Sequence, residues 1–316
     1  FYAKAEDVEA KGVKILTETE VSEIDFANKK VYAKTKSDDE IIEAYDKLVL
    51  ATGSRPIIPN LPGKDLKGIH FLKLFQEGQA IDAEFTKEKV KRIAVIGAGY
   101  IGTEIAEAAK RRGKEVLLFA AENTSLATFK NAAIKVDKHQ QSSDPDVYAV
   151  GDVATIYSNA LQDFTYIALA SNAVRSGIVA GHNIGGKELE SVGVQGSNGI
   201  SIFGYNMTST GLSVKAAKKL GLEVSFSDFE DKQKAWFLHE NNDSVKIRIV
   251  YETNSRRIIG AQLASKSEII AGNINMFSLA IQEKKTIDEL ALLDLFFLPH
   301  FNNPYNYMTV AALNAK

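Results

Sequence analysis

Short apolar runs separated by polar residues occupy the first fifty positions of the chain. Residues 13–16, 21–26, 30–34 and 47–50 have the length and composition of successive strands. Polar clusters at 27–29 and 37–39 separate them. Pro56, Pro59 and Pro62 then interrupt any regular element. The pattern predicts a β-meander that leads into a buried strand and is followed by a linker.

A different period begins near residue 90. Residues 92–96 and 115–119 are apolar runs typical of buried strands, and residues 103–112 carry the period of a helix. Together they predict one βαβ unit. Farther along we expect a strand at 147–150 and a helix that starts near Ile167. After about residue 187 the pattern becomes α+β. We expect a hairpin of two strands at 246–251 and 258–263. Helices are expected at 268–284 and 286–295.

Residues 97–102 carry the motif G-x-G-x-x-G between the predicted strand 92–96 and the predicted helix. A dinucleotide-binding turn requires this context. Gly97 allows the tight turn, Gly99 lets the backbone approach a pyrophosphate, and Gly102 lets helix and strand pack closely. The N–H groups at the start of the helix favour phosphate binding. The alternative is a glycine turn in a parallel sheet that binds no ligand.

The acidic residue that would bind the adenosine ribose is absent from its usual place. It is expected about 20 residues after the first glycine, at the end of the second strand. Ala120 stands there, 23 residues after Gly97 (120 − 97 = 23), and Glu122 is the nearest carboxylate. We therefore expect a weaker preference for NADH than an aspartate would give, with NADPH as the competing cosubstrate.

Two other strands end in residues typical of a second nucleotide site. The strand at 47–50 leads to small residues at 51–54, and the strand at 147–150 leads to Gly151 and Asp152. Ligands of open α/β sheets lie beyond the carboxyl ends of the strands. There the Asp152 carboxylate could accept hydrogen bonds from a polyol. The helix start near 167–171 could stabilise negative charge on a flavin ring, although an ordinary core helix and a simple Gly-Asp turn are the alternatives.

Composition restricts the class of protein. The 316 residues favour two or three domains, and 45% hydrophobic with 25% charged residues is an ordinary globular balance. A formal net charge of −2 supplies no basic field for nucleic acid or an anionic membrane. No apolar run approaches the roughly 18 residues of a membrane span, and we expect a cytoplasmic protein. The sequence contains no cysteine, so it supplies no disulfide, thiolate ligand or catalytic thiol.

Six stretches resemble the pyridine-nucleotide disulfide oxidoreductases, in the branch of NADH oxidases, NADH peroxidases and coenzyme A-disulfide reductases. They are residues 45–55, 93–107, 146–155, 166–177, 194–204 and 295–307. The segments 194–199 and 296–302 resemble the NADH oxidases in particular. The fold class implied is α/β, with Rossmann-like FAD and NAD(P) domains and a C-terminal α+β dimerisation domain. We expect the FAD domain at 1–58 and 128–186, the NAD(P) domain at 59–127 and the dimerisation domain at 187–316.

The resemblance also implies the residues that contact FAD and NAD. Asp152 would bind the ribityl chain, Ala168 and Gly199 would lie near the nicotinamide, and Ala170 would lie near the flavin. The complete set of expected cofactor contacts is Ala51, Thr52, Gly53, Ser54, Gly97, Gly99, Ile101, Gly102, Ala120, Asp152, Ala168, Leu169, Ala170, Ser171 and Gly199. No metal ligand is expected, because His70, His139, His182 and His239 have no acidic or histidine partner at ligand spacing.

The activity implied is oxidation of NADH through FAD with reduction of dioxygen to water, in a homodimer. Residues 299–301 would reach the partner subunit's flavin, where His300 is either a proton donor or an interface packing residue. NADH peroxidase and coenzyme A-disulfide reductase are alternatives within the branch, and an inactive nucleotide-binding chain is an alternative of another class. The family pattern also predicts an FAD-binding glycine motif and a redox cysteine before Phe1, and several dozen further residues between Phe119 and Gly151.

Overall fold

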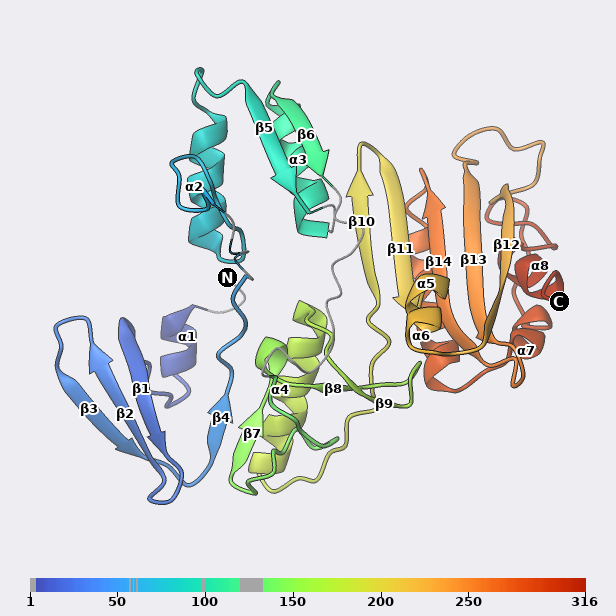
Figure 1. Ribbon diagram of the computed structural model, residues 1–316. Helices are drawn as coiled ribbons and strands as arrows, with labels where there is room; N and C mark the ends of the chain where they lie inside the picture. The colour runs from blue at the N-terminus through green and yellow to red at the C-terminus, as the bar shows by residue number, and fades with distance from the viewer. Residues whose placement is uncertain (1–3, 57, 59, 61, 98–99, 120–132) are drawn as a thin grey trace.

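The structure is a computed structural model, and it describes residues 4–56, 58, 60, 62–97, 100–119 and 133–316 (Figure 1). Its first elements are α1 (Ala5–Glu9), β1 (Thr19–Asp25), β2 (Lys30–Thr35) and β3 (Glu40–Ala44). The three strands form an antiparallel sheet in the order β1-β2-β3, as a meander requires. The prediction is wrong in two details. Residues 13–16 form no strand and carry exposed Val13 and Leu16, whereas β3, whose isoleucines are flanked by glutamates, was not expected.

A parallel pair of strands joins two distant parts of the chain. Strands β4 (Leu48–Leu50) and β7 (Val147–Ala149) are aligned from Leu48↔Val147 to Leu50↔Ala149, which agrees with the predicted strands 47–50 and 147–150. The elements after β7 are η1 (Gly151–Val153), β8 (Ile156–Ser158), β9 (Asp163–Thr165) and α4 (Ala170–Ile184). Helix α4 begins three residues after Ile167 and packs against η1.

The predicted βαβ unit is present between the two strands of that pair. It consists of β5 (Arg92–Ile96), α3 (Tyr100–Arg111) and β6 (Glu115–Phe119), preceded by α2 (Phe75–Phe85). The strands are parallel, and α3 packs against both of them. The expectation that both strands are buried is wrong, because Ile96 is 81% and Phe119 52% exposed. Among the described residues, the buried core of this unit is a cluster of three side chains, those of Ile81, Phe85 and Ala109.

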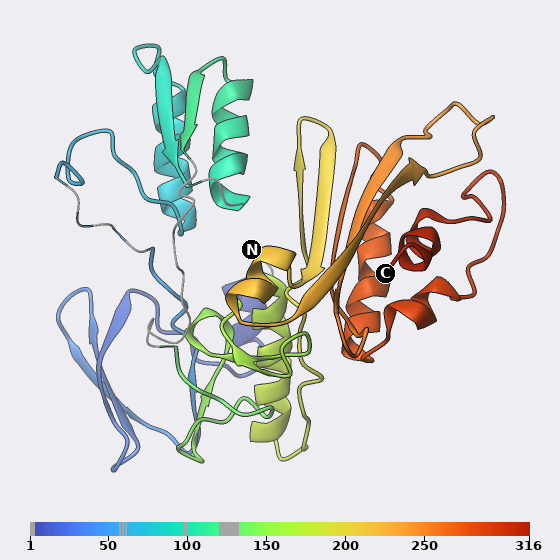
Figure 2. The ribbon, with the colours of Figure 1, turned by 45° about the vertical axis from the view of Figure 1, so that its right-hand side comes forward.

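The C-terminal part is built around a five-stranded antiparallel sheet in the order β10-β11-β14-β13-β12. Its elements are β10 (Asn198–Ile202), β11 (Tyr205–Gly211), α5 (Val214–Lys219), β12 (Val224–Lys232), β13 (Ser244–Glu252), β14 (Ile258–Ser265), α6 (Ile270–Gln282), α7 (Ile287–Ala291) and α8 (Tyr307–Leu313). The predicted hairpin is present as β13 and β14, and the predicted helix 268–284 is present as α6. The predicted helix 286–295 is shorter than expected, because α7 ends at Ala291. Figure 2 shows α6, α7 and α8 against one face of the sheet, where Ile249, Tyr251 and Phe277 are fully buried.

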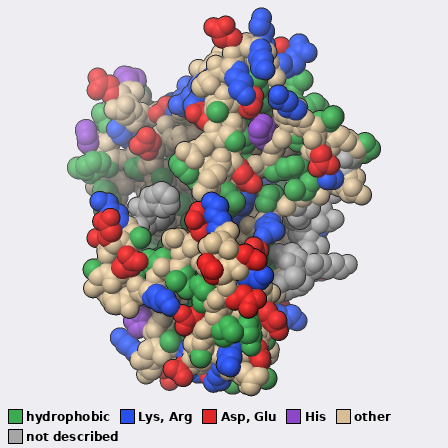
Figure 3. Space-filling view, turned by 90° about the vertical axis from the view of Figure 1, so that its left-hand side faces the viewer, with side chains coloured by type: hydrophobic (Ala, Val, Ile, Leu, Met, Phe, Trp, Pro, Cys, Tyr) green, Lys and Arg blue, Asp and Glu red, His purple; other side chains and the backbone are tan. Residues whose placement is uncertain are grey.

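The two parallel strand pairs are directed towards each other. In Figure 1 the arrowheads of β5 and β6 point down, and the arrowhead of β4 points up, towards the same middle region. On the face drawn in Figure 3, Lys and Arg side chains are interspersed with Asp and Glu. No helix among the described residues is long and apolar enough to cross a membrane.

Candidate nucleotide-binding site

The ends of β4 and β7 bring together the two halves of the predicted flavin site. Gly53 has φ 68° and Gly151 has φ 70°, a left-handed conformation that favours glycine immediately after each strand. Beyond these turns, Ser54 Oγ donates a hydrogen bond to Asp152 Oδ2 at 3.3 Å. Ala51 and Thr52 are exposed beside them. Two segments almost a hundred residues apart therefore form one polar site at one sheet edge.

Asp152 is the charged centre of this site. Its side chain is 19% exposed, and Lys73 Nζ donates to the same Oδ2 at 2.7 Å. The hydroxyl of Tyr166 donates to the Asp152 backbone carbonyl at 2.9 Å. From the described residues no hydrogen bond reaches Oδ1, which can accept one from a ligand hydroxyl. Sequence reasoning missed Lys73 and Tyr166, since neither belongs to a local motif and both are brought there by tertiary packing.

The start of α4 lies beside Gly151. A Cβ built on Gly151 would be 3.3 Å from the Ala173 Cβ, and the Gly151 N–H donates to Ser176 Oγ at 3.0 Å. No side chain caps α4 at Leu169, so its first N–H groups are left for water or a ligand. Three of the predicted contact residues at this helix start are exposed, namely Ala168, Ala170 and Ser171. An acceptor carboxylate, an uncapped helix end and a close glycine turn together fit the ribityl chain and ring of a flavin.

The dinucleotide motif shows the packing that its glycines predict. Gly97 has φ 114°, and its N–H donates to the Phe119 carbonyl at 2.9 Å. A Cβ on Gly102 would lie 1.8 Å from the Gly97 carbonyl oxygen, so only glycine allows α3 to start this close to β5. Ile101 is half exposed beside it. The expected contacts Gly99 and Ala120 lie outside the described residues.

Gly199 belongs to β10. It pairs with Thr208, and a Cβ at Gly199 would approach Thr208 Cγ2 to 3.2 Å. A Cβ at Gly196 would lie 3.4 Å from Ile167 Cγ2, which places the segment before β10 against the residues that lead into α4. The predicted nicotinamide neighbours Ala168 and Gly199 therefore belong to segments that pass each other.

His300 is not brought to this site within one chain. It is exposed in the loop between α7 and α8, where its ring meets Phe301 edge-on at a centroid distance of 5.2 Å. In Figure 1 those helices lie on the opposite side of the C-terminal sheet from β4 and β7. The described residues contain no group of three His, Asp or Glu side chains that could hold a metal. His139, for which no acidic partner at ligand spacing was expected, has nitrogens 3.7 Å from carboxylate oxygens of Asp137 and Glu188.

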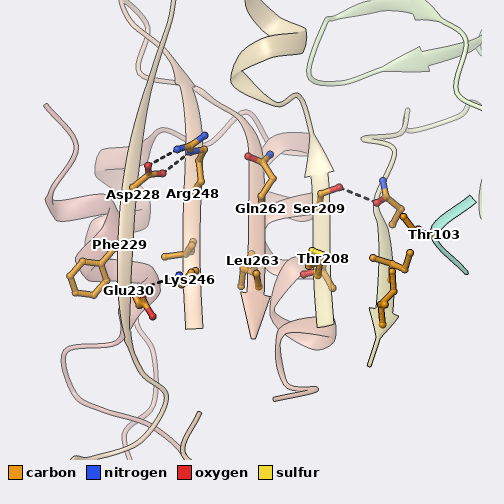
Figure 4. Close-up of a pocket in the computed structure, with 16 residues that line it drawn as sticks. Thr103, Thr208, Ser209, Asp228, Phe229, Glu230, Lys246, Arg248, Gln262 and Leu263 are labelled. Carbon is orange, nitrogen blue, oxygen red and sulfur yellow. Dashed lines mark hydrogen bonds and ion pairs between the residues drawn. The ribbon is translucent and has the colours of Figure 1, made fainter. Parts of the chain in front are cut away.

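A hollow of about 830 Å³ lies on the open face of the C-terminal sheet beside α3 (Figure 4). Its charged side chains are paired with one another: Arg248 donates to both carboxylate oxygens of Asp228, and Lys246 faces Glu230. It contains none of the predicted site residues. We therefore assign the chemistry to the strand ends, where polar groups are directed outwards, and not to this hollow.

Asp146 fixes the opposite ends of the same strands. Directly before β7, its carboxylate pairs with Lys29 of the β1–β2 turn and, at 2.6 Å, with Lys47 directly before β4. The hydrogen bonds from these two lysines, Lys29 first, lower the pKa of Asp146 to about 2. The amino ends of β4 and β7 are thus held together, which aligns the carboxyl ends that carry Ser54 and Asp152.

Comparison with known proteins agrees with this geometry. A model described as pyridine nucleotide-disulphide oxidoreductase matches residues 3–129 and 117–177, and the dimerisation domain of the same family matches residues 199–308. An NADH oxidase of Lactococcus lactis subsp. cremoris is 80% identical over all of this chain and 87% of its own length.

Two solved structures have the same fold. The water-forming NADH oxidase of Lactobacillus brevis bound to NADH is 28% identical with a TM-score of 0.90, over 99% of this chain and 84% of its own. An engineered water-forming NADPH oxidase derived from it, bound to NADPH, is also 28% identical with a TM-score of 0.90, over 99% and 85%.

The alignment to the Lactococcus enzyme also contains residues that have no counterpart inside this chain. It runs over 388 residues, 72 more than the chain has (388 − 316 = 72). The first family model matches in two pieces that overlap at 117–129, at the start of the interval where the resemblance predicted several dozen further residues. Despite this internal gap, both family domains match in order and the identity is 80%, so the chain belongs to the pyridine nucleotide-disulphide oxidoreductases.

Proposed function

We infer that this protein is an FAD-dependent NADH oxidase that reduces dioxygen to water. The observation that carries this inference is the pair of strand-end sites directed towards each other, one built on Gly97 and Gly102 and the other on Ser54 and Asp152. A nicotinamide held by the first can meet a flavin held by the second. The names of the Lactococcus and Lactobacillus relatives support NADH and oxygen as the substrates.

Each part of the site has a defined task in this reaction. FAD, when bound, supplies the hydride acceptor and the group that reacts with oxygen. Asp152 accepts a hydrogen bond from the ribityl chain, while Lys73 balances its charge. The N–H groups at the start of α4 favour negative charge on the ring. The turn at Gly97 and Gly102 presents backbone N–H groups to the pyrophosphate of NADH, which orients the nicotinamide.

The domain limits and the partner follow from the same proposal. Residues 1–58 and 128–186 form the FAD domain, 59–127 the NAD(P) domain and 187–316 the surface for a second copy of the chain. In such a homodimer the exposed loop with Phe296, His300 and Phe301 faces the partner subunit, which gives His300 a place beside the partner's flavin. There its imidazole, a group that can take up and release a proton, acts as a proton donor.

Stoichiometry with oxygen tests the reaction. Two NADH and two protons per dioxygen yield two NAD⁺ and two waters, whereas one NADH and one proton per dioxygen yield NAD⁺ and hydrogen peroxide. We expect a yellow protein that absorbs near ~450 nm, consumes two NADH per oxygen and releases no peroxide. Since the sequence contains no cysteine, a one-to-one ratio with peroxide would show that these residues do not complete the reduction to water. Feeding NADH with peroxide, or with coenzyme A disulfide, separates the related activities.

The flavin half can be tested without activity. Asp152→Ala removes the acceptor of the ribityl hydroxyl and leaves Lys73 and Ser54 without their carboxylate partner. Hydrogen bonds to charged groups contribute about 1.5–3 kcal/mol, so we expect the Kd of FAD in apoprotein reconstitution to rise by roughly ten- to a hundredfold. Asp152→Asn keeps an acceptor oxygen and is the matched control, with a smaller loss. Equal FAD affinity in the wild type and Asp152→Ala would contradict the assignment.

A further inference from the structure

Glu107 joins the nucleotide-binding helix α3 to the C-terminal sheet. Its side chain is 10% exposed, and its Oε1 accepts the backbone N–H of Phe203 at 2.9 Å and Nη2 of Arg111 at 2.7 Å. An unpaired carboxylate at this depth would be costly, and these bonds satisfy it. The Phe203 N–H is the largest cause of a lowered pKa of the Glu107 carboxyl, with Arg111 acting in the same direction.

The donor belongs to a rigid turn. Phe203 and Gly204 are the two loop residues of the hairpin of β10 and β11, which is closed by the pair Ile202 and Tyr205. Their φ values of 49° and 76° are both positive, as in a type I′ turn, the geometry that matches the twist of a hairpin. The hairpin ladder does not use the N–H of the first loop residue. This N–H is therefore fixed in direction, and it meets α3.

The same two elements carry the expected NADH contacts at their other ends. Helix α3 starts at the dinucleotide turn, and Thr103, one turn before Glu107, lines the hollow that Asn198 and Ile200 of β10 also line (Figure 4). One face of α3 thus runs along β10, and the two elements are in contact. Gly199 lies near the start of β10. The hydrogen bond between Glu107 and Phe203 therefore fixes the distance between α3, which follows the glycine turn, and β10, which contains Gly199.

We propose that Glu107 is a positioning residue for NADH, which holds α3 and β10 at the separation that lets the glycine turn and the Gly199 segment contact one nucleotide. The proposal rests on the proposed function, in that the nucleotide is NADH. Glu107 acts through the hairpin and contacts no reacting atom. Its loss weakens NADH binding and leaves the later reaction of the flavin with oxygen unchanged.

Steady-state kinetics and direct binding test this role. For Glu107→Ala we expect the KM for NADH and the Kd of NAD⁺ to rise about tenfold, or about 1.4 kcal/mol, with kcat at saturating NADH within about twofold. Glu107→Gln keeps an acceptor oxygen and restores binding to within about threefold. Arg111→Met removes only the ion pair, and Phe203→Gly keeps the N–H, so both stay within about twofold of the wild type. If Glu107→Ala does not fold, Glu107→Asp is used for the same measurements. It keeps the negative charge, but its shorter side chain moves the oxygen away from the Phe203 N–H.

Amide hydrogen exchange gives a readout that does not need catalysis. Removing the acceptor should speed exchange in a peptide that contains Phe203 and leave peptides of α6 unchanged. Faster exchange with unaltered NADH affinity would overturn the positioning role, and unaltered exchange would overturn the contact itself. A wild-type protein that binds NADH but does not reduce oxygen would contradict the proposed function and not the role of Glu107. That role would then still be decided by comparing the nucleotide affinities of the wild type and Glu107→Ala.

Discussion

The C-terminal sheet and the βαβ unit of the dinucleotide motif are stabilised in different ways. The C-terminal sheet has a large continuous core, with Tyr251 and Phe277 fully buried. The βαβ unit and α2 together form a buried apolar cluster of three side chains among the described residues, and Ile96 and Phe119 are exposed. Since apolar burial is the main source of stability, the first region supports itself. The βαβ unit depends on contacts with other parts of the chain.

Two charge-assisted contacts supply part of that support. Lys73, just before α2, pairs with Asp152 of the flavin site, and Glu107 of α3 binds the turn at Phe203. Each connects the βαβ unit to a neighbouring part that carries another portion of the expected active site. The unit most directly concerned with NADH is thus positioned by polar contacts at its borders, while the region farthest from the strand ends provides the rigid frame.

Core truncation should show the contrast most strongly. Phe277→Ala removes a fully buried ring from the C-terminal core, and such changes cost about 3–5 kcal/mol. Phe85→Ala in the small cluster should cost about 3 kcal/mol or less, because its open surroundings can close around the gap. Denaturant midpoints followed by circular dichroism would measure both. Equal losses of stability would show that the two clusters are packed equally well.

A substitution at the glycine turn should disturb binding more than stability. The Cβ of Gly102→Ala would lie 1.8 Å from the Gly97 carbonyl, which forces α3 away from β5. Overpacking of this kind costs about 1–3 kcal/mol, and we expect the KM for NADH to rise about tenfold or more. Gly181→Ala in α4, where the added methyl meets nothing within 4 Å, is the control and should stabilise by about 0.4–1 kcal/mol. An unchanged KM for Gly102→Ala would show that the turn does not position NADH.

A substitution at position 120 should change the preference between NADH and NADPH. Ala120→Asp restores a carboxylate that accepts the ribose hydroxyls and repels a 2′-phosphate. We expect the ratio of kcat/KM for NADH over NADPH to rise about tenfold, with no change in thermal stability. The hypothesis fails if that ratio stays the same.

Acid should weaken the ion pairs that hold the amino ends of β4 and β7 together. The Asp146 pKa is lowered from 3.8 to about 2, so its ion pairs stabilise the fold above pH 4 and are lost as the pH falls towards 2. Asp146→Asn should therefore lower the Tm at neutral pH, and the difference from the wild type should shrink below pH 4 and vanish below pH 2. A difference of constant size from pH 7 down to pH 2 would point to a cause other than charge.

The sequence pattern predicted β5 and β6 at their observed limits and α3 with a start three residues too late, because apolar runs and helical periods are properties of a short segment. The rule that ligands lie at strand ends also grouped Ser54 with Asp152 in one expected site, and the two side chains are hydrogen-bonded. Strands β10 and β11 were missed, since glycine, serine, asparagine and threonine dominate them and these residues are typical of turns. Strand β12 was missed because charged residues interrupt its apolar positions.

The contacts of Lys73 and Glu107 could not be predicted from the sequence. Lys73 is 79 residues from its partner Asp152, and Glu107 is 96 residues from its partner Phe203. Neither pair shares a helix face or a hairpin. Their meeting depends on how whole units pack, and a single sequence carries no local signal of that packing.

The pairing of β4 with β7 sets an order on folding. Leu48 and Val147 are 99 positions apart (147 − 48 = 99), with the βαβ unit between them. Closing so long a loop costs entropy before any contact compensates, which makes the step slow. During synthesis the flavin half remains open until residue 150 has left the ribosome, and a βαβ unit that has already collapsed shortens the distance its ends must cover. The flavin site therefore cannot form before the βαβ unit has been synthesised.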